Sequence, residues 1–258
     1  MRFLCLHGAG SNAAVLEAQL AAILKEFAEH EFHFLQGEVE VEPEKGVKDY
    51  FAGPYLSYFD LCTPSQIRSA FQLLDKAIAE EGPFDGVFAF SQGSALAASY
   101  MLYHARHSLP SEQPFRSAVF FSASLPFDSE SRPFSVDRSG TCYYPLPEAS
   151  EPCAVNLSAT IPELLDPAYV HKWDQTTQFL ERYGAGHAVS VPIEVPTAHI
   201  YALNDSYGSH AAQVQGFCVS WNREVLVHDG GHAIPYHPST TVKMVECIRK
   251  VLDSTTAF

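Results

Sequence analysis

The sequence lacks any apolar run long enough to cross a membrane. No stretch approaches the roughly 20 consecutive apolar residues that a membrane-spanning helix needs. The apolar run within residues 1–8 is also far too short for a signal peptide. We therefore expect a protein that is not secreted and has no membrane partner.

Basic residues are scarce relative to acidic ones. The chain has 16 Lys and Arg against 30 Asp and Glu, which gives a formal net charge of −14. Such a charge repels nucleic acids and anionic membrane surfaces, so neither is an expected partner. An acidic surface either keeps the protein soluble or docks a basic partner, and the sequence does not choose between these roles.

Closely spaced cysteines are absent as well. The cysteines are scattered along the chain without a Cys-x-x-Cys pair: Cys5, Cys62, Cys142, Cys153, Cys218 and Cys247. This spacing does not favour a zinc site, and without a signal peptide it indicates reduced thiols in a cytoplasmic protein. We expect no metal ion and no organic cofactor.

Short apolar runs alternate with amphipathic segments along the 258 residues. The apolar runs predict buried strands at 2–6, 32–35, 87–90, 118–121, 198–203 and 224–228. Helical spacing predicts helices at about 15–27, 64–81, 92–102, 206–218 and 239–252. This alternation predicts an α/β fold with a mostly parallel central sheet flanked by helices, and the length fits a single domain, residues 1–258.

Two segments break the alternation. Residues 37–63 open with acidic side chains and end with aromatic ones, and a loop this long is usually functional when it is ordered. Residues 122–192 are rich in Pro and Ser at first and predict helices near 161–163 and at 167–183. We interpret about 123–192 as a cap inserted between core strands, because it lacks an apolar pattern large enough for its own core.

The stretch around Ser91 predicts a reactive serine. Ser91 lies between the strand at 87–90 and a helix rich in Ala and Leu, with the small residues Ala89 and Gly93 on either side. This is the arrangement of a nucleophile elbow, whose usual pattern is Gly-x-Ser-x-Gly, so Ala89 is a departure. The alternative is an ordinary strand-to-helix turn in which Ser91 caps the helix.

Two later residues match the partners that a reactive serine needs. Asp205 follows the strand at 198–203, and His232 lies in a glycine-rich loop after the strand at 224–228. Because the carboxyl ends of parallel strands share one edge of the sheet, we expect all three side chains to meet there. The order Ser, Asp, His is that of a catalytic triad on an α/β-hydrolase fold.

Each partner has a plainer interpretation. Asp205 is also a candidate N-cap for the helix that begins near Ser206, and Asp229 is a weaker rival for the acid. His228 and His232 have the spacing of helical metal ligands, but the glycines between them oppose a helix.

The loop after the first strand supplies a candidate oxyanion hole. Gln92 N–H at the start of the helix is one expected donor, and Ala9 N–H between two glycines is the other. His7 is predicted to be structural, with hydrogen bonds inside this loop.

Four segments together resemble the fungal serine hydrolase family. They are residues 6–12 (LHGAGSN), 53–58 (GPYLSY), 90–93 (FSQG) and 230–235 (GGHAIP). The resemblance covers almost the whole chain, least of all 122–192, and implies the α/β-hydrolase fold with Ser91, Asp205 and His232 as its triad. Within the family, the chain is similar to trans-acting thioesterases of fungal polyketide biosynthesis.

This resemblance implies hydrolysis of an acyl thioester, with a polyketide chain released from the carrier domain of a synthase. Tyr55, Tyr58 and Phe59 are predicted to form an apolar acyl pocket, or alternatively to fix a loop to the core. The alternative activity is that of a general carboxylesterase on small esters. A third hypothesis is a non-catalytic binding protein on the same fold.

Overall fold

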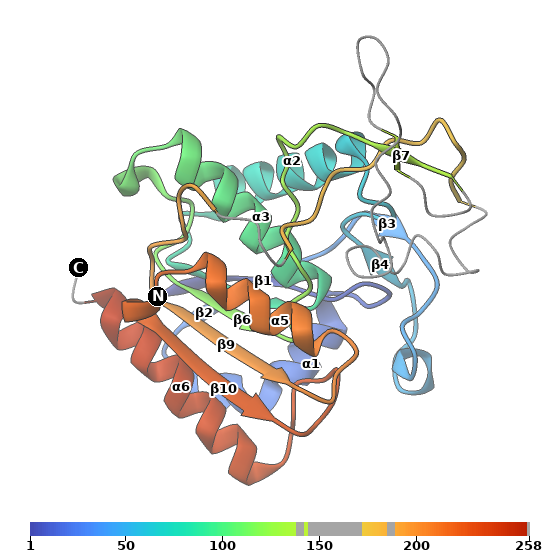
Figure 1. The fold of residues 1–258 in the computed structure, drawn as a ribbon. Coiled ribbons are helices and arrows are strands. Elements are labelled where there is room, and N and C mark those ends of the chain that lie inside the picture. The colour runs from blue at the N-terminus through green and yellow to red at the C-terminus, as the bar shows by residue number, and fades with distance from the viewer. Residues whose placement is uncertain (138–141, 144–171, 185–188, 257–258) are drawn as a thin grey trace.

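A parallel six-stranded sheet forms the centre of the molecule (Figure 1). The structure is a computed structural model that describes residues 1–137, 142–143, 172–184 and 189–256. In spatial order the strands are β10 (Arg223–His228), β9 (Thr197–Ala202), β6 (Ala118–Phe121), β5 (Gly86–Phe90), β1 (Arg2–Leu6) and β2 (Glu31–Leu35). The predicted strands are confirmed, each to within a residue or so.

Helices cover both faces of this sheet (Figure 1). They are α1 (Ala13–Leu24), α2 (Pro64–Glu81), α3 (Gln92–His107), α5 (Gly208–Val214) and α6 (Pro238–Thr256). The side chains of α1 and α6 pack on one face, and those of α2, α3 and α5 pack on the other. Asn12 caps α1 and Thr63 caps α2, each by accepting a hydrogen bond from the backbone N–H three residues later.

The two-sided burial explains why the strands read as continuous apolar runs. In β1, Leu4 and Leu6 join the core beneath α2 and α3, whereas Phe3 and Cys5 join the core beneath α1 and α6. Alternate side chains of a strand point to opposite faces, so a strand covered on both sides needs apolar residues throughout. This is the expected parallel-sheet pattern.

The segment between β2 and α2 carries a small antiparallel pair, β3 (Val39–Glu40) and β4 (Leu56–Ser57). Leu56 also bridges to Ser11, so this segment is tied to the turn after β1. The segment therefore lies beside the carboxyl end of β1, where the candidate site was expected.

The helix predicted at 167–183 is wrong for the part that the structure describes. Residues 172–183 contain no helix. Instead, Phe179 forms an isolated antiparallel β-bridge with Phe134, and Arg182 forms one with Phe127. The spacing of Phe179, Leu180 and Tyr183 resembled a helical stripe, yet all three side chains are buried in the core shared with α2 and α3. Two short strands, β7 (Ser135–Val136) and β8 (Cys142–Tyr143), also lie in the predicted cap, and the expected helix near 161–163 lies outside the described residues.

Across the described ranges, we find no helix both long enough and apolar enough to cross a bilayer.

Candidate active site

Ser91 occupies the sharp turn between β5 and α3. Its φ is 53° and its ψ is −114°, in a region that residues with side chains rarely adopt. The turn brings α3 so close to β1 that a Cβ at Gly93 would lie 2.4 Å from the carbonyl oxygen of Leu6. The small residue at 93 is therefore required by the approach of β1, while Ala89 is accommodated within buried β5.

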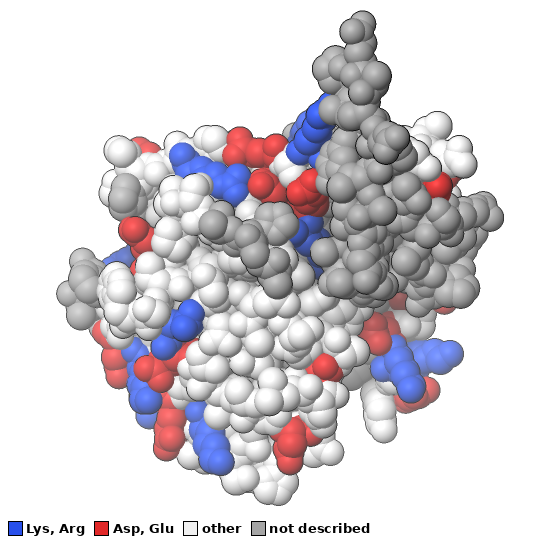
Figure 2. Space-filling view, in the orientation of Figure 1, with Lys and Arg blue, Asp and Glu red and all other residues white. Residues whose placement is uncertain are grey.

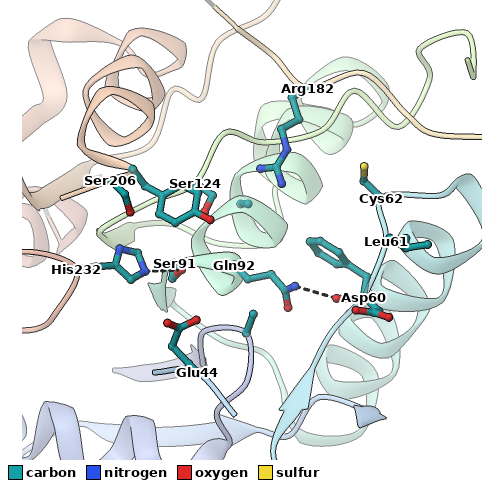
Figure 3. Close-up of a pocket in the computed structure, with 14 residues that line it drawn as sticks. Glu44, Asp60, Leu61, Cys62, Ser91, Gln92, Ser124, Arg182, Ser206 and His232 are labelled. Carbon is teal, nitrogen blue, oxygen red and sulfur yellow. Dashed lines mark hydrogen bonds between the residues drawn. The ribbon is translucent and has the colours of Figure 1, made fainter. Parts of the chain in front are cut away.

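The structure brings Ser91, His232 and Asp205 into one chain of hydrogen bonds. His232 Nε2 lies 2.9 Å from Ser91 Oγ, and His232 Nδ1 lies 2.7 Å from Asp205 Oδ2. Figure 3 shows the imidazole pointing at Ser91, and both residues line one cavity. In this geometry an imidazole can accept the serine proton while the carboxylate holds its orientation.

Asp205 is held as a carboxylate. Its side chain is buried, and burial alone would raise its pKa, but hydrogen bonds from His232 and from the Tyr207 N–H, at 2.8 Å, outweigh this and lower the pKa. The buried Ser122 hydroxyl also lowers the pKa of Asp205. Its Oγ has no partner among the described residues at normal hydrogen-bond geometry. Asp205 thus both supports the turn into α5 and faces His232.

The loop that carries His232 is anchored by a residue that the sequence did not single out. Asn204 Nδ2 donates to the Asp229 carbonyl at 2.9 Å, and Asn204 Oδ1 accepts from the Gly231 N–H at 3.2 Å. Gly231 has a φ of 67°, so this turn suits a glycine. Asp205, not Asp229, contacts the His232 ring, and His228 ends β10 as expected.

The expected oxyanion donors line the same cavity. Ala9 and Gln92 both border it next to Ser91. Neither backbone N–H donates a hydrogen bond to any residue that the structure describes. Two backbone donors beside a serine hydroxyl are suited to hold a developing negative charge.

His7 is buried, holds the turn after β1 by hydrogen bonds and does not line the cavity. Its Nδ1–H donates to the Gly8 carbonyl at 2.7 Å, and its Nε2 accepts from the Gly37 N–H at 3.0 Å. The ring stacks on Tyr58, with centroids 4.8 Å apart. Burial lowers the pKa of His7 to about 4, so the ring is a neutral support for the turn after β1.

The three aromatic residues predicted to form the acyl pocket have different places. Phe59 lines the cavity. Tyr58 does not, because its buried hydroxyl donates to the Leu35 carbonyl and accepts from the His7 N–H. Tyr55 donates its hydroxyl to the Phe51 carbonyl and also lies outside the cavity lining. For Tyr55 and Tyr58 these contacts fit the alternative interpretation, in which they hold the loop in place, and their role in an acyl pocket stays a prediction.

The Gln92 side chain joins the turn at Ser91 to this aromatic segment. Its Oε1 accepts from the Tyr58 N–H at 3.0 Å, and its Nε2 donates to the Phe59 carbonyl at 2.8 Å (Figure 3). The same residue therefore presents its backbone N–H to the cavity and fixes the backbone that carries Phe59.

The cavity has a volume of about 340 Å³ and charged as well as apolar walls. Beside Ser91, His232 and Phe59, its lining includes residues that the sequence did not indicate: Glu44, Asp60, Leu61, Cys62, Ser124, Arg182 and Tyr207. Asp60 pairs with Lys172 at 3.1 Å. Five of these lining residues come from segments without a helical or strand period, and Arg182 and Tyr207 lie where the sequence predicts helices, so no sequence pattern marked any of them as part of a site.

No cluster of three or more His, Cys, Asp or Glu side chains in the described ranges is placed to hold a metal ion. Cys5, Cys218 and Cys247 are buried free thiols.

Comparisons with known proteins identify the family of this chain. A family model described as Serine hydrolase (FSH1) matches residues 1–244. Esterase FPY3 of Fusarium mangiferae is 33% identical over 257 residues, covering 98% of this chain and 97% of its own. Esterase alnB of Emericella nidulans is 32% identical over 262 residues, covering 91% and 90%.

Solved structures are similar in fold. Esterase PE8 aligns with a TM-score of 0.52 at 16% identity, covering 97% of this chain and 92% of its own. A carboxylesterase from Mesorhizobium loti aligns with a TM-score of 0.51 at 13% identity, covering 96% and 88%. The central parallel sheet with its flanking helices is accordingly an α/β-hydrolase fold, and the match over residues 1–244 shows that the chain belongs to the FSH1 family of serine hydrolases.

Proposed function

We propose that this protein hydrolyses acyl thioesters, with Ser91 as nucleophile, His232 as general base and acid, and Asp205 as the residue that orients His232. The observation that carries the proposal is the continuous chain of hydrogen bonds from Ser91 through His232 to Asp205 at the cavity. A serine hydroxyl is a weak nucleophile until a positioned base removes its proton.

In the first half-reaction, Ser91 Oγ attacks the thioester carbonyl carbon while His232 Nε2 takes the hydroxyl proton. The Ala9 and Gln92 N–H groups stabilise the resulting oxyanion. The carbon–sulfur bond then breaks, His232 returns its proton to the leaving thiolate, and the acyl group remains on Ser91 as an ester. Asp205 stays ionised throughout, as its lowered pKa favours.

In the second half-reaction, water replaces the thiol. His232 accepts a proton from the water as its oxygen attacks the acyl-enzyme, and then returns the proton to Ser91 as the ester bond breaks. The products are the free acid and the regenerated serine. None of these steps requires a metal ion or an organic cofactor.

We further propose that the acyl group is a polyketide chain delivered on the carrier domain of a synthase. The support is the similarity of the chain to trans-acting thioesterases within the family that the motifs around 6–12, 53–58, 90–93 and 230–235 indicate. Carrier domains are themselves usually acidic, so a net charge of −14 opposes docking by broad charge attraction. Contact with such a partner would have to be local.

The second candidate is a carboxylesterase that acts on small esters without a protein partner. The observation that favours it is that the relatives FPY3 and alnB are both named esterases. The same residues would perform the reaction, with an alkoxide in place of the thiolate. The two candidates differ in the leaving group and in the length of acyl chain that is preferred.

The test compares hydrolysis of acyl thioesters with the matching oxygen esters over a range of chain lengths, for the wild type and Ser91→Ala. A thioester preference that grows with chain length and disappears in Ser91→Ala supports the first proposal. Equal or faster turnover of short oxygen esters favours the carboxylesterase. Labelling of Ser91 by a fluorophosphonate excludes a non-catalytic role, whereas activity that survives in Ser91→Ala overturns the proposed nucleophile.

A further inference from the structure

The strand at one edge of the central sheet, β10, is uncovered along its outer side. It ends the spatial order of the six strands, so only β9 pairs with it. The backbone of Arg223–His228 makes no hydrogen bond to the backbone of any described residue outside the sheet. Since an edge strand presents a row of N–H and C=O groups that lack a neighbouring strand, β10 is free to pair with one more.

Two apolar side chains of β10 face solvent. Val225 is 42% exposed and Val227 is 46% exposed. Leu226 packs on the core beneath α1 and α6, so the two valines point to the opposite face of the sheet. On that face α5 has only seven residues and packs on β9, which leaves the valines uncovered. Figures 1 and 2 together show that the surface over β9, β10 and α5 is largely uncharged.

Features that commonly oppose pairing at an edge are absent from β10. Such features are lysine, proline and β-bulges. The strand contains no Lys and no Pro, and its register with β9 runs without a bulge from Arg223 to His228. Its two charged side chains are held by their own chain, because Arg223 Nη1 donates to the Gln215 carbonyl and Glu224 accepts from Lys250 at 3.1 Å.

The strand is complementary to itself when two copies run antiparallel. A two-fold axis at Leu226, perpendicular to the sheet, keeps each face continuous, because facing residues then lie on the same side. In this register the facing residues match in character: Leu226 with Leu226, Val225 with Val227, Glu224 with His228 and Arg223 with Asp229. No like charges face each other. The nearest alternative registers of this kind, with the axis at Val225 or Val227, would place Glu224 or His228 opposite Leu226.

We propose that two copies of this chain associate through β10, antiparallel about Leu226, so that their six-stranded sheets become continuous. The opposite edge strand, β2, is described in full and exposes no large apolar side chain. The association therefore closes at two copies and does not extend into a filament. An interface built on one short strand is small, so we expect the dimer to dissociate on dilution. The inference is independent of the reaction proposed for Ser91.

Sedimentation velocity measures the association over protein concentrations from about 1 μM to about 500 μM. The wild type is expected to pass from monomer to dimer within this range. Val225→Lys combined with Val227→Lys places like charges opposite each other, and it should raise the dissociation constant at least about tenfold. Both valines are exposed, so the monomer should keep its circular dichroism and its thermal unfolding temperature.

Val225→Lys combined with Val227→Glu tests the register itself. About Leu226, each new lysine faces a new glutamate of the second copy, so this variant should associate at least about tenfold more tightly than the variant with two lysines. Val242→Lys is the matched control, since Val242 on α6 is 57% exposed and lies outside β10. It lies two turns before Arg249, which reaches Glu26 just after α1, and its dissociation constant should not change.

Hydrogen exchange in the wild type gives a second measure that needs no variant. Amides of 223–228 should exchange more slowly at high protein concentration than at low concentration. A wild type that stays monomeric throughout overturns the proposal and leaves the edge to a different partner. A dimer that tolerates both lysines also overturns it, because the contact then lies elsewhere, and equal weakening in the two double variants refutes the register about Leu226.

Discussion

Ser91 and Ser122 have positive φ angles, 53° and 43°, and each follows a strand of the sheet. Such conformations cost on the order of 1–3 kcal/mol in a residue with a side chain and persist where neighbours fix them. Here the Ser91 N–H donates to Phe121 at 2.9 Å, and the Ser122 N–H donates to Ile200 at 2.8 Å. Each strained serine is therefore held by the carbonyl of the adjacent strand, one beside His232 and the other beside Asp205.

Gly93 and Ala89 allow the two sides of the Ser91 turn to be tested separately. Gly93→Ala would place a Cβ 2.4 Å from the Leu6 carbonyl oxygen and should cost about 1–3 kcal/mol of stability. Because the clash displaces the start of α3, we expect esterase activity to fall on the order of 100-fold. The measurement is kcat/KM together with the free energy of unfolding in urea.

Ala89→Gly is the matched control and restores the usual glycine of the motif. It should lower stability by about 0.5–1 kcal/mol, since a glycine within a strand loses more conformational freedom on folding. Activity should stay near that of the wild type. Equal activity in both variants would contradict the steric argument for Gly93.

The buried histidines His7 and His199 predict a loss of stability in mild acid. Burial lowers the pKa of His7 to about 4 and that of His199 to about 3, so both rings are neutral in the folded protein. In the unfolded chain they take up protons as the pH falls below about 6.5, which favours unfolding. Each histidine then removes about 1.4 kcal/mol per pH unit, until the pH reaches its folded pKa.

Urea unfolding at about pH 7, 6 and 5 measures this slope. His7→Asn should be less stable near neutral pH but should show a shallower decline below it, because one of the two groups is gone. A wild-type free energy of unfolding that does not change between these pH values would contradict the prediction.

At the scale of elements, the sheet was predictable and the cavity wall was not. Strands such as β1 are apolar on both faces, so a short local run was sufficient to find them. Chain order then predicted that Ser91, Asp205 and His232 meet at one sheet edge. Arg182 was missed, because the apolar residues around it mimic a helix, and Asn204 was missed because its partners lie some 25 residues further on.

Gln92 connects α3 to the segment that carries Phe59, and this link predicts an effect on acyl binding. Gln92→Glu keeps the backbone N–H and the acceptor for Tyr58 but removes the donor to the Phe59 carbonyl. We expect a loss of about 1–3 kcal/mol in stability. KM should rise for long acyl chains more than kcat falls, because the wall at Phe59 moves.

Gln66→Glu is the matched control for this substitution. Gln66 Oε1 accepts from the N–H groups of Asp60 at 2.7 Å and Leu61 at 2.9 Å, and a glutamate carboxylate preserves both bonds. Its kinetics should remain close to those of the wild type. An identical change in KM for both variants would show that the donor to Phe59 is not what matters.

At the scale of the molecule, charge is dispersed on the face shown in Figure 2. Acidic and basic side chains alternate around a broad uncharged area on that face. The net charge of −14 therefore does not form one continuous acidic field there.

Because its thiols are buried, we expect the cysteines of this protein to react with a labelling reagent only when the whole domain unfolds. Burial raises the pKa of Cys218 to about 12 and that of Cys247 to about 11, and it raises that of Cys5 well above its ordinary value. Since the thiolate is the reactive form, all three should resist a thiol reagent in the folded protein. Labelling of each site, followed by mass spectrometry across a urea series, should track the loss of circular dichroism.

A variant with Cys142→Ser and Cys153→Ser serves as the control, so that the reagent is not consumed at those two positions. Fast labelling of Cys5 or Cys218 in native buffer, without any change in circular dichroism, would contradict the prediction.

Ser91 precedes the long segment between β6 and β9, whereas Asp205 and His232 follow it. The two parts of the chain are joined by parallel pairing, from Ala118 with Thr197 to Phe121 with Ile200, and by the apolar core shared by α1 and α6. If the chain were divided genetically within that segment, neither fragment would contain the full set of reactive side chains. The fold thus lends itself to complementation, in which hydrolysis of a chromogenic ester reports that two separately expressed halves have reassembled.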